Sequence, residues 1–327
     1  MKKKPFAIIF LLLLAIIPAV WLSLCAGASG FGLPDTSTEI GKAIFMLRKY
    51  RILTGFMVGA SLSCAGAVFQ ALLRNPLAEP YVLGISSGAG LGAAIAILAG
   101  LATANVLALP ITAFISAGIT LALVFRLASD NGESPSIYSL ILSGVIVSSV
   151  CSSMLMFLVA IAPVEGLHSV VWWMLGNLQP ADSSLLNIAS VVILAGMFIL
   201  WAMSPELNAM TLGSETAHYL GIRTRFVLVL CLAIATLITA SAVGLAGLIG
   251  FVGLIVPHAA RQLVGPDHKK LFPASALLGG IFLILCDVFS RTILAPREIP
   301  VGVITAIFGG PFFLVLLKIR SKRGWLE

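Results

Sequence analysis

Few side chains in the long apolar runs of this sequence could do chemistry. Asp287 is the clearest acidic group within such a run, and Arg291 follows it by four residues. Residues four apart lie on one face of a helix, so the carboxylate and the guanidinium can pair. A carboxylate inside a membrane could also relay protons in a transporter. Because a positive partner is within reach, we predict a structural ion pair near the outer end of a membrane helix.

The sequence lacks several motifs that identify catalytic or metal sites. No G-x-x-x-x-G-K-[ST] loop occurs, so the chain carries no nucleotide-binding P-loop of its own. No H-E-x-x-H motif occurs either. The cysteines form no C-x-x-C pair and lie in or beside apolar runs, as packing residues do. They are Cys25, Cys64, Cys151, Cys231 and Cys286. We therefore predict no catalytic residues, no metal site and no cofactor.

A stripe of small residues runs through the apolar segment at 137–161. Gly144, Ser148 and Ser152 recur there every four residues, which places them on one face of a helix. Small residues let two helices approach closely. The same smooth surface would suit the wall of a pathway for a bulky solute. Both interpretations stay open, and both hold if the stripe faces a dimer axis.

The segment at 212–222 is polar enough to lie outside a membrane. Ser214 can cap a short helix whose first turn carries Glu215, and Gly221 can end that helix. A short capped helix of this kind would serve as a lever for a partner protein. A surface loop would have a similar sequence, so the residues alone leave both interpretations open.

Membrane-spanning helices must position all of these residues. Hydrophobic residues make up 59% of the chain and charged residues only 10%, whereas soluble domains carry roughly 25% charged residues. A spanning helix needs about 20 mostly apolar residues. The apolar runs predict ten spans, near 6–25, 52–73, 81–100, 107–127, 137–161, 185–203, 226–246, 248–264, 271–290 and 300–319.

The run at 226–264 is the irregular one. At a rise of about 1.5 Å per residue it is too long for one crossing and short for two. Glycine recurs within it at every third position, at Gly244, Gly247, Gly250 and Gly253. This spacing predicts a broken, closely packed turn inside the protein rather than a lipid-facing helix.

The basic residues indicate the orientation of the chain. They form short clusters between apolar runs rather than one basic face, which argues against a nucleic-acid partner. Loops rich in Lys and Arg stay in the cytoplasm, and this rule places both termini there. We predict a single transmembrane domain over 1–327, with a cytoplasmic N-terminus at 1–5, spans over about 6–319 and a basic cytoplasmic tail at 320–327.

Four stretches of the sequence resemble one known family. They are RNPLAEPYVLGISSGAG at 74–90, LGSETAHYLGI at 212–222, GLIGFVGLIVPHAARQLVGPDHKKLFPAS at 247–275 and PVGVITAIFGGPFFLVLL at 300–317. With the spacing of the spans, residues 47–319 resemble the FecCD-type permeases of bacterial ABC importers, which serve iron-siderophore, haem and vitamin B12 uptake. The resemblance implies an all-α membrane bundle of about ten helices, like the vitamin B12 permease of type II importers.

The resemblance also implies an assembly in the cytoplasmic (inner) membrane. Two permease subunits, identical or related, would surround a central pathway above two cytoplasmic ATPase subunits. A periplasmic or lipid-anchored binding protein would deliver the substrate from outside. The residues that meet the ATPase would be Gly213, Glu215, Ala217, Leu220 and Gly221.

Arg48, Arg51 and Arg291 match the family's docking positions for acidic residues of the binding protein. The predicted orientation puts all three on the outer side. The planar fork of arginine binds a carboxylate bidentately, which suits this role. Interfacial arginines that reach toward lipid headgroups would have the same composition, but the resemblance favours docking.

We therefore expect a permease subunit, not an enzyme, that forms the pathway for an iron chelate. Cobalamin and haem are the alternative cargoes, because the small residues of the pathway do not distinguish among them. An ion-coupled secondary transporter and a membrane enzyme are the rivals from other classes. The lack of carboxylate pairs in the spans argues against the first, and the lack of a catalytic constellation argues against the second.

Overall fold

The computed structural model describes residues 5–27, 30–105, 107–129, 135–179 and 183–321. Helices dominate this part of the chain, which confirms the predicted all-α class. They are α1 (Pro5–Cys25), α2 (Glu39–Leu72), η1 (Pro80–Leu83), α3 (Ile85–Leu98), α4 (Leu101–Ala104), α5 (Ala108–Ala128), α6 (Ile137–Ile161), α7 (Val164–Met174), α8 (Ser183–Ala202), α9 (Ser204–Met210), α10 (Ser214–Tyr219), α11 (Thr224–Ala246), α12 (Val252–Val264), α13 (His268–Thr292) and α14 (Val301–Ser321). Two short strands, β1 (Ala26–Gly27) and β2 (Gly30–Phe31), pair antiparallel.

Each of the ten predicted spans corresponds to a helix. Within the described residues, seven helices are long and apolar enough to cross a membrane, and α3 and residues 301–315 of α14 are shorter apolar helices. The chain is thus a multi-pass membrane protein. Side chains such as Phe10 on α1, Ile119 on α5 and Phe198 on α8 are exposed, as lipid-facing residues are.

Helix α2 begins earlier than the sequence predicts. The predicted span begins near 52, but the helix starts at Glu39. The reason is local, because the Thr38 hydroxyl oxygen accepts a hydrogen bond from the Gly41 amide at 3.1 Å and Glu39 lies in the first turn. Both features stabilise a helix N-terminus.

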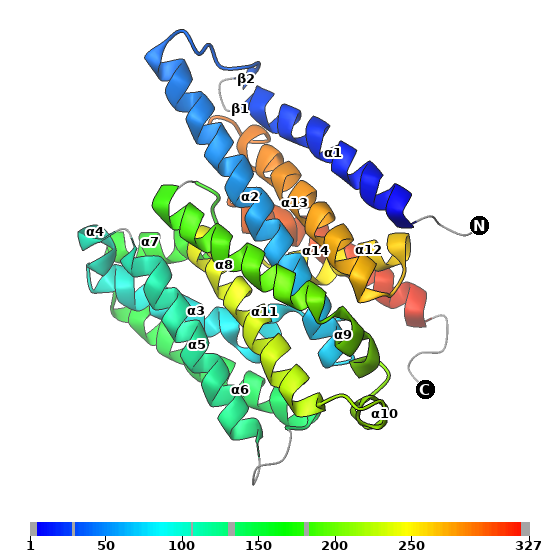
Figure 1. Cartoon of the computed structure of the whole chain (residues 1–327). Helices are drawn as coiled ribbons and strands as arrows, with labels where there is room; N and C mark the ends of the chain where they lie inside the picture. Colours follow the sequence, from blue (N-terminus) through cyan, green and yellow to red (C-terminus); the bar gives the residue numbers. More distant parts are fainter. Residues whose placement is uncertain (1–4, 28–29, 106, 130–134, 180–182, 322–327) are drawn as a thin grey trace.

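Helix α2 is the centre of the bundle and packs against α11, α12 and α13 (Figure 1). Glycines allow the close approach of these helices. A Cβ atom added at Gly59 would lie 2.2 Å from the Gly279 carbonyl oxygen, and one added at Gly66 would lie 1.9 Å from the Gly253 carbonyl oxygen. The backbones are therefore in contact, as small residues permit between membrane helices.

The remaining helices flank this centre on two sides. Helix α1 lies along α13, whereas α3 packs with α5 and α6 on the other side of α2 (Figure 1). The strands β1 and β2 lie at one end of the bundle, and α9 and α10 lie at the other. Helix α2 runs from one end to the other and contacts both α1 and α9 (Figure 1).

The predicted break in the run at 226–264 is confirmed. Helix α11 ends at Ala246 and α12 begins only at Val252, with positive φ angles of 70° at Gly247 and 68° at Phe251. The Tyr81 hydroxyl donates to the Ile249 carbonyl at 2.8 Å and accepts from the Ile249 amide at 3.1 Å. Irregular backbone at membrane depth needs such partners from the protein, because lipid offers none.

Candidate functional site

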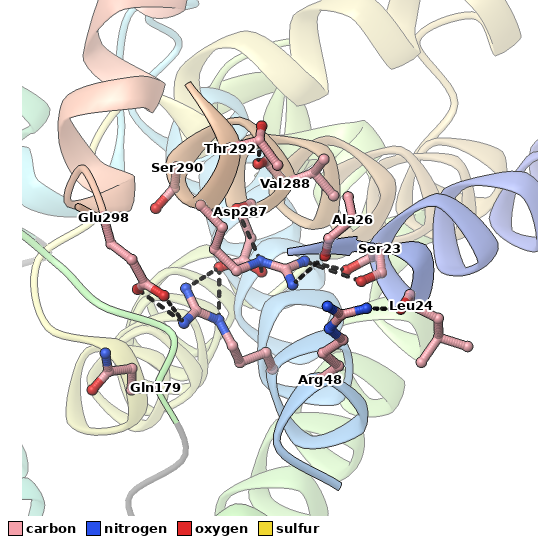
Figure 2. Close-up of polar contacts among 12 residues, drawn as sticks. Ser23, Leu24, Ala26, Arg48, Gln179, Asp287, Val288, Ser290, Thr292 and Glu298 are labelled. Atoms are coloured by element: carbon pink, nitrogen blue, oxygen red, sulfur yellow. Dashed lines mark hydrogen bonds and ion pairs between the residues drawn. The ribbon is translucent and has the colours of Figure 1, made fainter. Parts of the chain in front are cut away.

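Arginines and carboxylates from two helices and a loop meet at the end of the bundle that carries β1 and β2 (Figure 2). Arg48 and Arg51 come from α2, Asp287 and Arg291 from α13, and Glu298 from the loop between α13 and α14. We call these five residues the arginine cluster. The helices α2 and α13 are far apart in the sequence, and only their contact in the fold brings these residues together.

Arg51 is the centre of the arginine cluster. Its Nη2 atom lies 2.7 Å from Asp287 Oδ1, and its Nε atom donates to the same oxygen at 3.1 Å. Its Nη1 atom lies 3.0 Å from both carboxylate oxygens of Glu298. The predicted pair within α13 is confirmed, since Arg291 Nε lies 2.9 Å from Asp287 Oδ2. The Asp287 carboxylate is therefore ion-paired with two arginines at once.

Arg48 and Arg291 hold the C-terminal end of α1. Arg291 donates to the Ser23 hydroxyl at 2.8 Å and to the Ala26 carbonyl at 3.0 Å. Arg48 Nη1 donates to the carbonyl oxygens of Leu24, Cys25 and Gly32. The last carbonyls of a helix lack partners within it and carry partial negative charge, so they attract cations.

Docking would need the three arginines at the surface, but the structure shows them buried. Arg48, Arg51 and Arg291 are only 5%, 2% and 3% exposed. The guanidinium groups already bind the end of α1 and the carboxylates of the cluster. The sequence could not reveal these contacts. The docking role stays a prediction, and it requires a route by which a partner can reach at least one of the three.

The predicted short helix at the other end of the bundle is present as α10, although Gly213 and not Ser214 is its N-cap. Gly213 has a positive φ of 114°, and Ser214 is the first helical residue. Glu215 and Leu220 are exposed, whereas Ala217 is buried against the bundle. The helix ends before Gly221, whose φ of 82° is typical of glycine at this position.

The surface around α10 offers apolar groups to a partner. Tyr219 and Tyr138 are each 86% exposed, and Leu212 and Leu220 are exposed as well. A hollow of about 350 Å³ lies beside α10, lined by residues from α2, α6, α9, α10 and α11 and by Arg74, which follows α2. Exposed apolar residues around a hollow are typical of a protein interface.

The three residues of the stripe on α6 lie in different environments. Gly144 is buried against η1, where an added Cβ atom would lie 2.9 Å from the Val82 carbonyl oxygen. Ser148 is half-buried and donates to the Gly144 carbonyl at 2.6 Å, and Ser152 is exposed. Close packing thus accounts for Gly144 within one chain. The structure leaves Ser152 and part of Ser148 accessible to a second subunit or to a pathway.

Glu298 and Tyr81 are functional candidates that the sequence analysis did not single out. Glu298 lies in a loop without periodicity, and its partner Arg51 is 247 residues away in the chain. Tyr81 stands inside the stretch at 74–90 that carries the family resemblance, which was the only signal for it.

Comparison with known proteins decides the family. The model of the FecCD transport family matches residues 7–319. The chain belongs to this family. This FecCD-type permease is 42% identical over 293 residues to the cobalamin import system permease protein BtuC of Halobacterium salinarum, a match that covers 90% of this chain and 77% of that protein. It is 35% identical over 332 residues to the Fe(3+)-citrate import system permease protein YfmE of Bacillus subtilis, with 98% of each chain covered.

A solved structure supports the same assignment. It is described as an inward-facing conformation of a metal-chelate type ABC transporter, and it aligns with a TM-score of 0.86 at 32% identity over 96% of this chain and 99% of that one. The FecCD-type permease is thus a membrane subunit of an ABC importer. Its relatives bear the names of permeases and not of enzymes.

Proposed function

We propose that this FecCD-type permease forms the pathway by which an ABC importer moves an iron chelate across the cytoplasmic membrane. The observation that supports this most directly is the arrangement of two candidate partner surfaces at opposite ends of one bundle. The arginine cluster lies at the end with β1 and β2, and the exposed helix α10 lies at the other (Figure 1). A permease must contact a delivery protein on one side of the membrane and an energy source on the other.

On the inner side, α10 would sit in a groove of an ATPase subunit. Glu215, Leu220 and the exposed Tyr219 would form the contact, while the buried Ala217 anchors the helix to the bundle. Gly213 and Gly221 would allow the tight turns on either side. Two permeases, identical or related, would pair above two ATPase subunits, and both termini would lie in the cytoplasm as the basic residues indicate.

On the outer side, a substrate-binding protein would dock at the arginine cluster through its own acidic residues. Glu298 is the part of the cluster that reaches the surface, with 32% of its side chain exposed. Arg51 directly beneath it would be the first guanidinium that a partner meets. Charge complementarity of this kind sets the rate and the orientation of docking.

The cargo is the finer part of the proposal. An iron chelate is our first candidate, in line with the relative named for Fe(3+)-citrate. Cobalamin is the second, because the Halobacterium relative named for it is 42% identical. Haem is the third, because a hemin transport permease of Yersinia pestis is 36% identical over 282 residues.

Transport by the assembled complex would test the function. The permease would be reconstituted in liposomes with its ATPase and binding protein, and uptake of radiolabelled ferric citrate, cyanocobalamin and hemin would be compared. We expect ATP-dependent uptake of one of these chelates that ionophores leave unchanged. Uptake driven by an ion gradient without ATP would contradict the proposal and favour a secondary transporter.

A further inference from the structure

The arginine cluster is short of negative charge. In the described part of the chain, the cluster holds three guanidinium groups but the carboxylates of only Asp287 and Glu298, which pair with Arg51 and Arg291. Arg48 hydrogen-bonds to carbonyl oxygens instead. Buried charge without full compensation is costly. The cluster is therefore a place where a further carboxylate is favourable.

The two carboxylates of the cluster are held very differently. Asp287 lies on helix α13 with a side chain that is 2% exposed, and it pairs with both Arg51 and Arg291. Glu298 lies on the loop before α14 with 32% of its side chain exposed, and it binds Arg51 Nη1 at 3.0 Å. Exposure weakens an ion pair, because water screens both charges. Glu298 is thus the carboxylate that can leave.

Glu298 also occupies the approach to Arg51. It lines a small hollow at the surface together with Arg51, Trp172 and Gln179. Figure 2 shows Glu298 and Gln179 on the same side of the cluster, away from Leu24 and Ser23 at the end of α1. A carboxylate that arrives from outside reaches Arg51 Nη1 where the carboxylate of Glu298 now lies.

We infer that Glu298 is an internal substitute for an acidic side chain of the binding protein. On docking, the incoming carboxylate takes its place at Arg51, and Glu298 turns toward solvent. This inference rests on the docking role proposed above. It explains how a buried arginine can serve as a docking residue, since the exchange replaces one carboxylate by another and keeps Arg51 paired.

The exchange would also reach the interior of the permease. Glu298 precedes α14 by three residues, and the first amides of α14 bind the segment that follows α7. The Val301 amide donates to the Gly176 carbonyl at 3.2 Å, and the Gly302 amide donates to the Leu175 carbonyl at 3.1 Å. Release of Glu298 would therefore loosen the outer end of α14 when the binding protein is present.

The decisive variant is Glu298→Gln, which keeps the shape of the side chain and removes its charge. The matched control is Glu39→Gln, which removes one charge near the same end of α2 from a carboxylate that pairs with the exposed Lys42. Affinity for the cargo-free binding protein of the same transport system would be measured with the purified permease–ATPase complex in nanodiscs. We expect E298Q to bind about tenfold more tightly and E39Q to bind like the parent.

A second measurement follows the loop itself. The five cysteines are buried, so a spin label would attach selectively to the exposed cysteine of the Arg297→Cys variant. Because residue 297 directly precedes Glu298, the label would report on the motion of this loop. We expect the label to become more mobile when the binding protein is added. An unchanged spectrum on saturation with the binding protein would overturn the exchange.

Arg51→Lys separates failure of the exchange from failure of docking, because lysine keeps the charge but loses the bidentate fork. If R51K weakens binding while E298Q binds no more tightly than the parent, Arg51 is a docking residue and the exchange is wrong. If both variants bind like the parent, docking does not involve Arg51 and both proposals fail. Thermal unfolding of each variant would verify that the bundle remains folded.

Discussion

Arg51 on α2 and Asp287 on α13 form a buried ion pair, with 2.7 Å between Nη2 and Oδ1 and 236 residues between them in the chain. Both side chains are only 2% exposed. The pair joins the two central helices at the same end at which α1 is held by Arg291. It therefore connects the fold of the bundle to the surface that we propose for docking.

Replacement of Asp287 by Ala should destabilise the bundle strongly. The change leaves Arg51 and Arg291 without their shared carboxylate in a buried place, and loss of one partner of a buried pair costs about 3–5 kcal/mol. We expect a clear fall in the midpoint of thermal unfolding in detergent. The control is Glu39→Ala, which removes an exposed pair with Lys42 and should cost less than about 1 kcal/mol. Equal effects of the two changes would contradict a structural role for Asp287.

Tyr81→Phe should destabilise the irregular segment between α11 and α12. The hydroxyl group both donates to and accepts from Ile249, so its removal leaves two backbone groups without these partners, at about 1–3 kcal/mol each. We expect lower thermal stability and reduced ATP-dependent uptake. Tyr138→Phe is the control, because Tyr138 is 86% exposed. A Y81F variant with the stability and uptake of the parent would show that the break does not depend on this hydroxyl.

Gly66→Val should prevent the close approach of α2 and α12. Even a single added Cβ atom would lie 1.9 Å from the Gly253 carbonyl oxygen, which is backbone and cannot rotate away. Overfilling of packed contacts typically costs about 1–3 kcal/mol and sometimes more. We expect a low yield of monodisperse protein on size-exclusion chromatography. Gly118→Val should behave like the parent, because an added Cβ atom there meets nothing within 4 Å.

Gly221→Val should uncouple the permease from its ATPase. The φ of 82° at this position is strained for a β-branched residue, while the surrounding space is empty. The cost should therefore fall on the end of α10 and not on the membrane helices. We expect normal insertion and thermal stability, with ATP hydrolysis that no longer drives uptake.

A cross-link would test the same contact directly. Tyr219→Cys is the better site than the buried Ala217, because Tyr219 is 86% exposed. We expect a cysteine at 219 to cross-link to the ATPase subunit and one at exposed Ile119 on α5 to fail. The absence of any product from 219 in an active complex would count against α10 as the contact.

The length of the apolar runs was sufficient to predict the ten spans, because lipid imposes the same requirement on every span. The break at 247–251 was also predictable, since glycines at regular spacing cannot form a stable lipid-facing helix. The i, i+4 pair of Asp287 and Arg291 followed from helix geometry alone. These are local properties, and the residues that carry them are neighbours in the chain.

Only the tertiary structure decided what the arginines contact. Arg48 and Arg51 stand in the sequence as basic residues on the outer side, and only the family resemblance favoured docking over a headgroup role there. Their burial depends on where α1 ends and on how α13 crosses α2, and the partner Glu298 comes from a distant loop. Such contacts depend on the packing of whole helices, so no spacing within the chain predicts them.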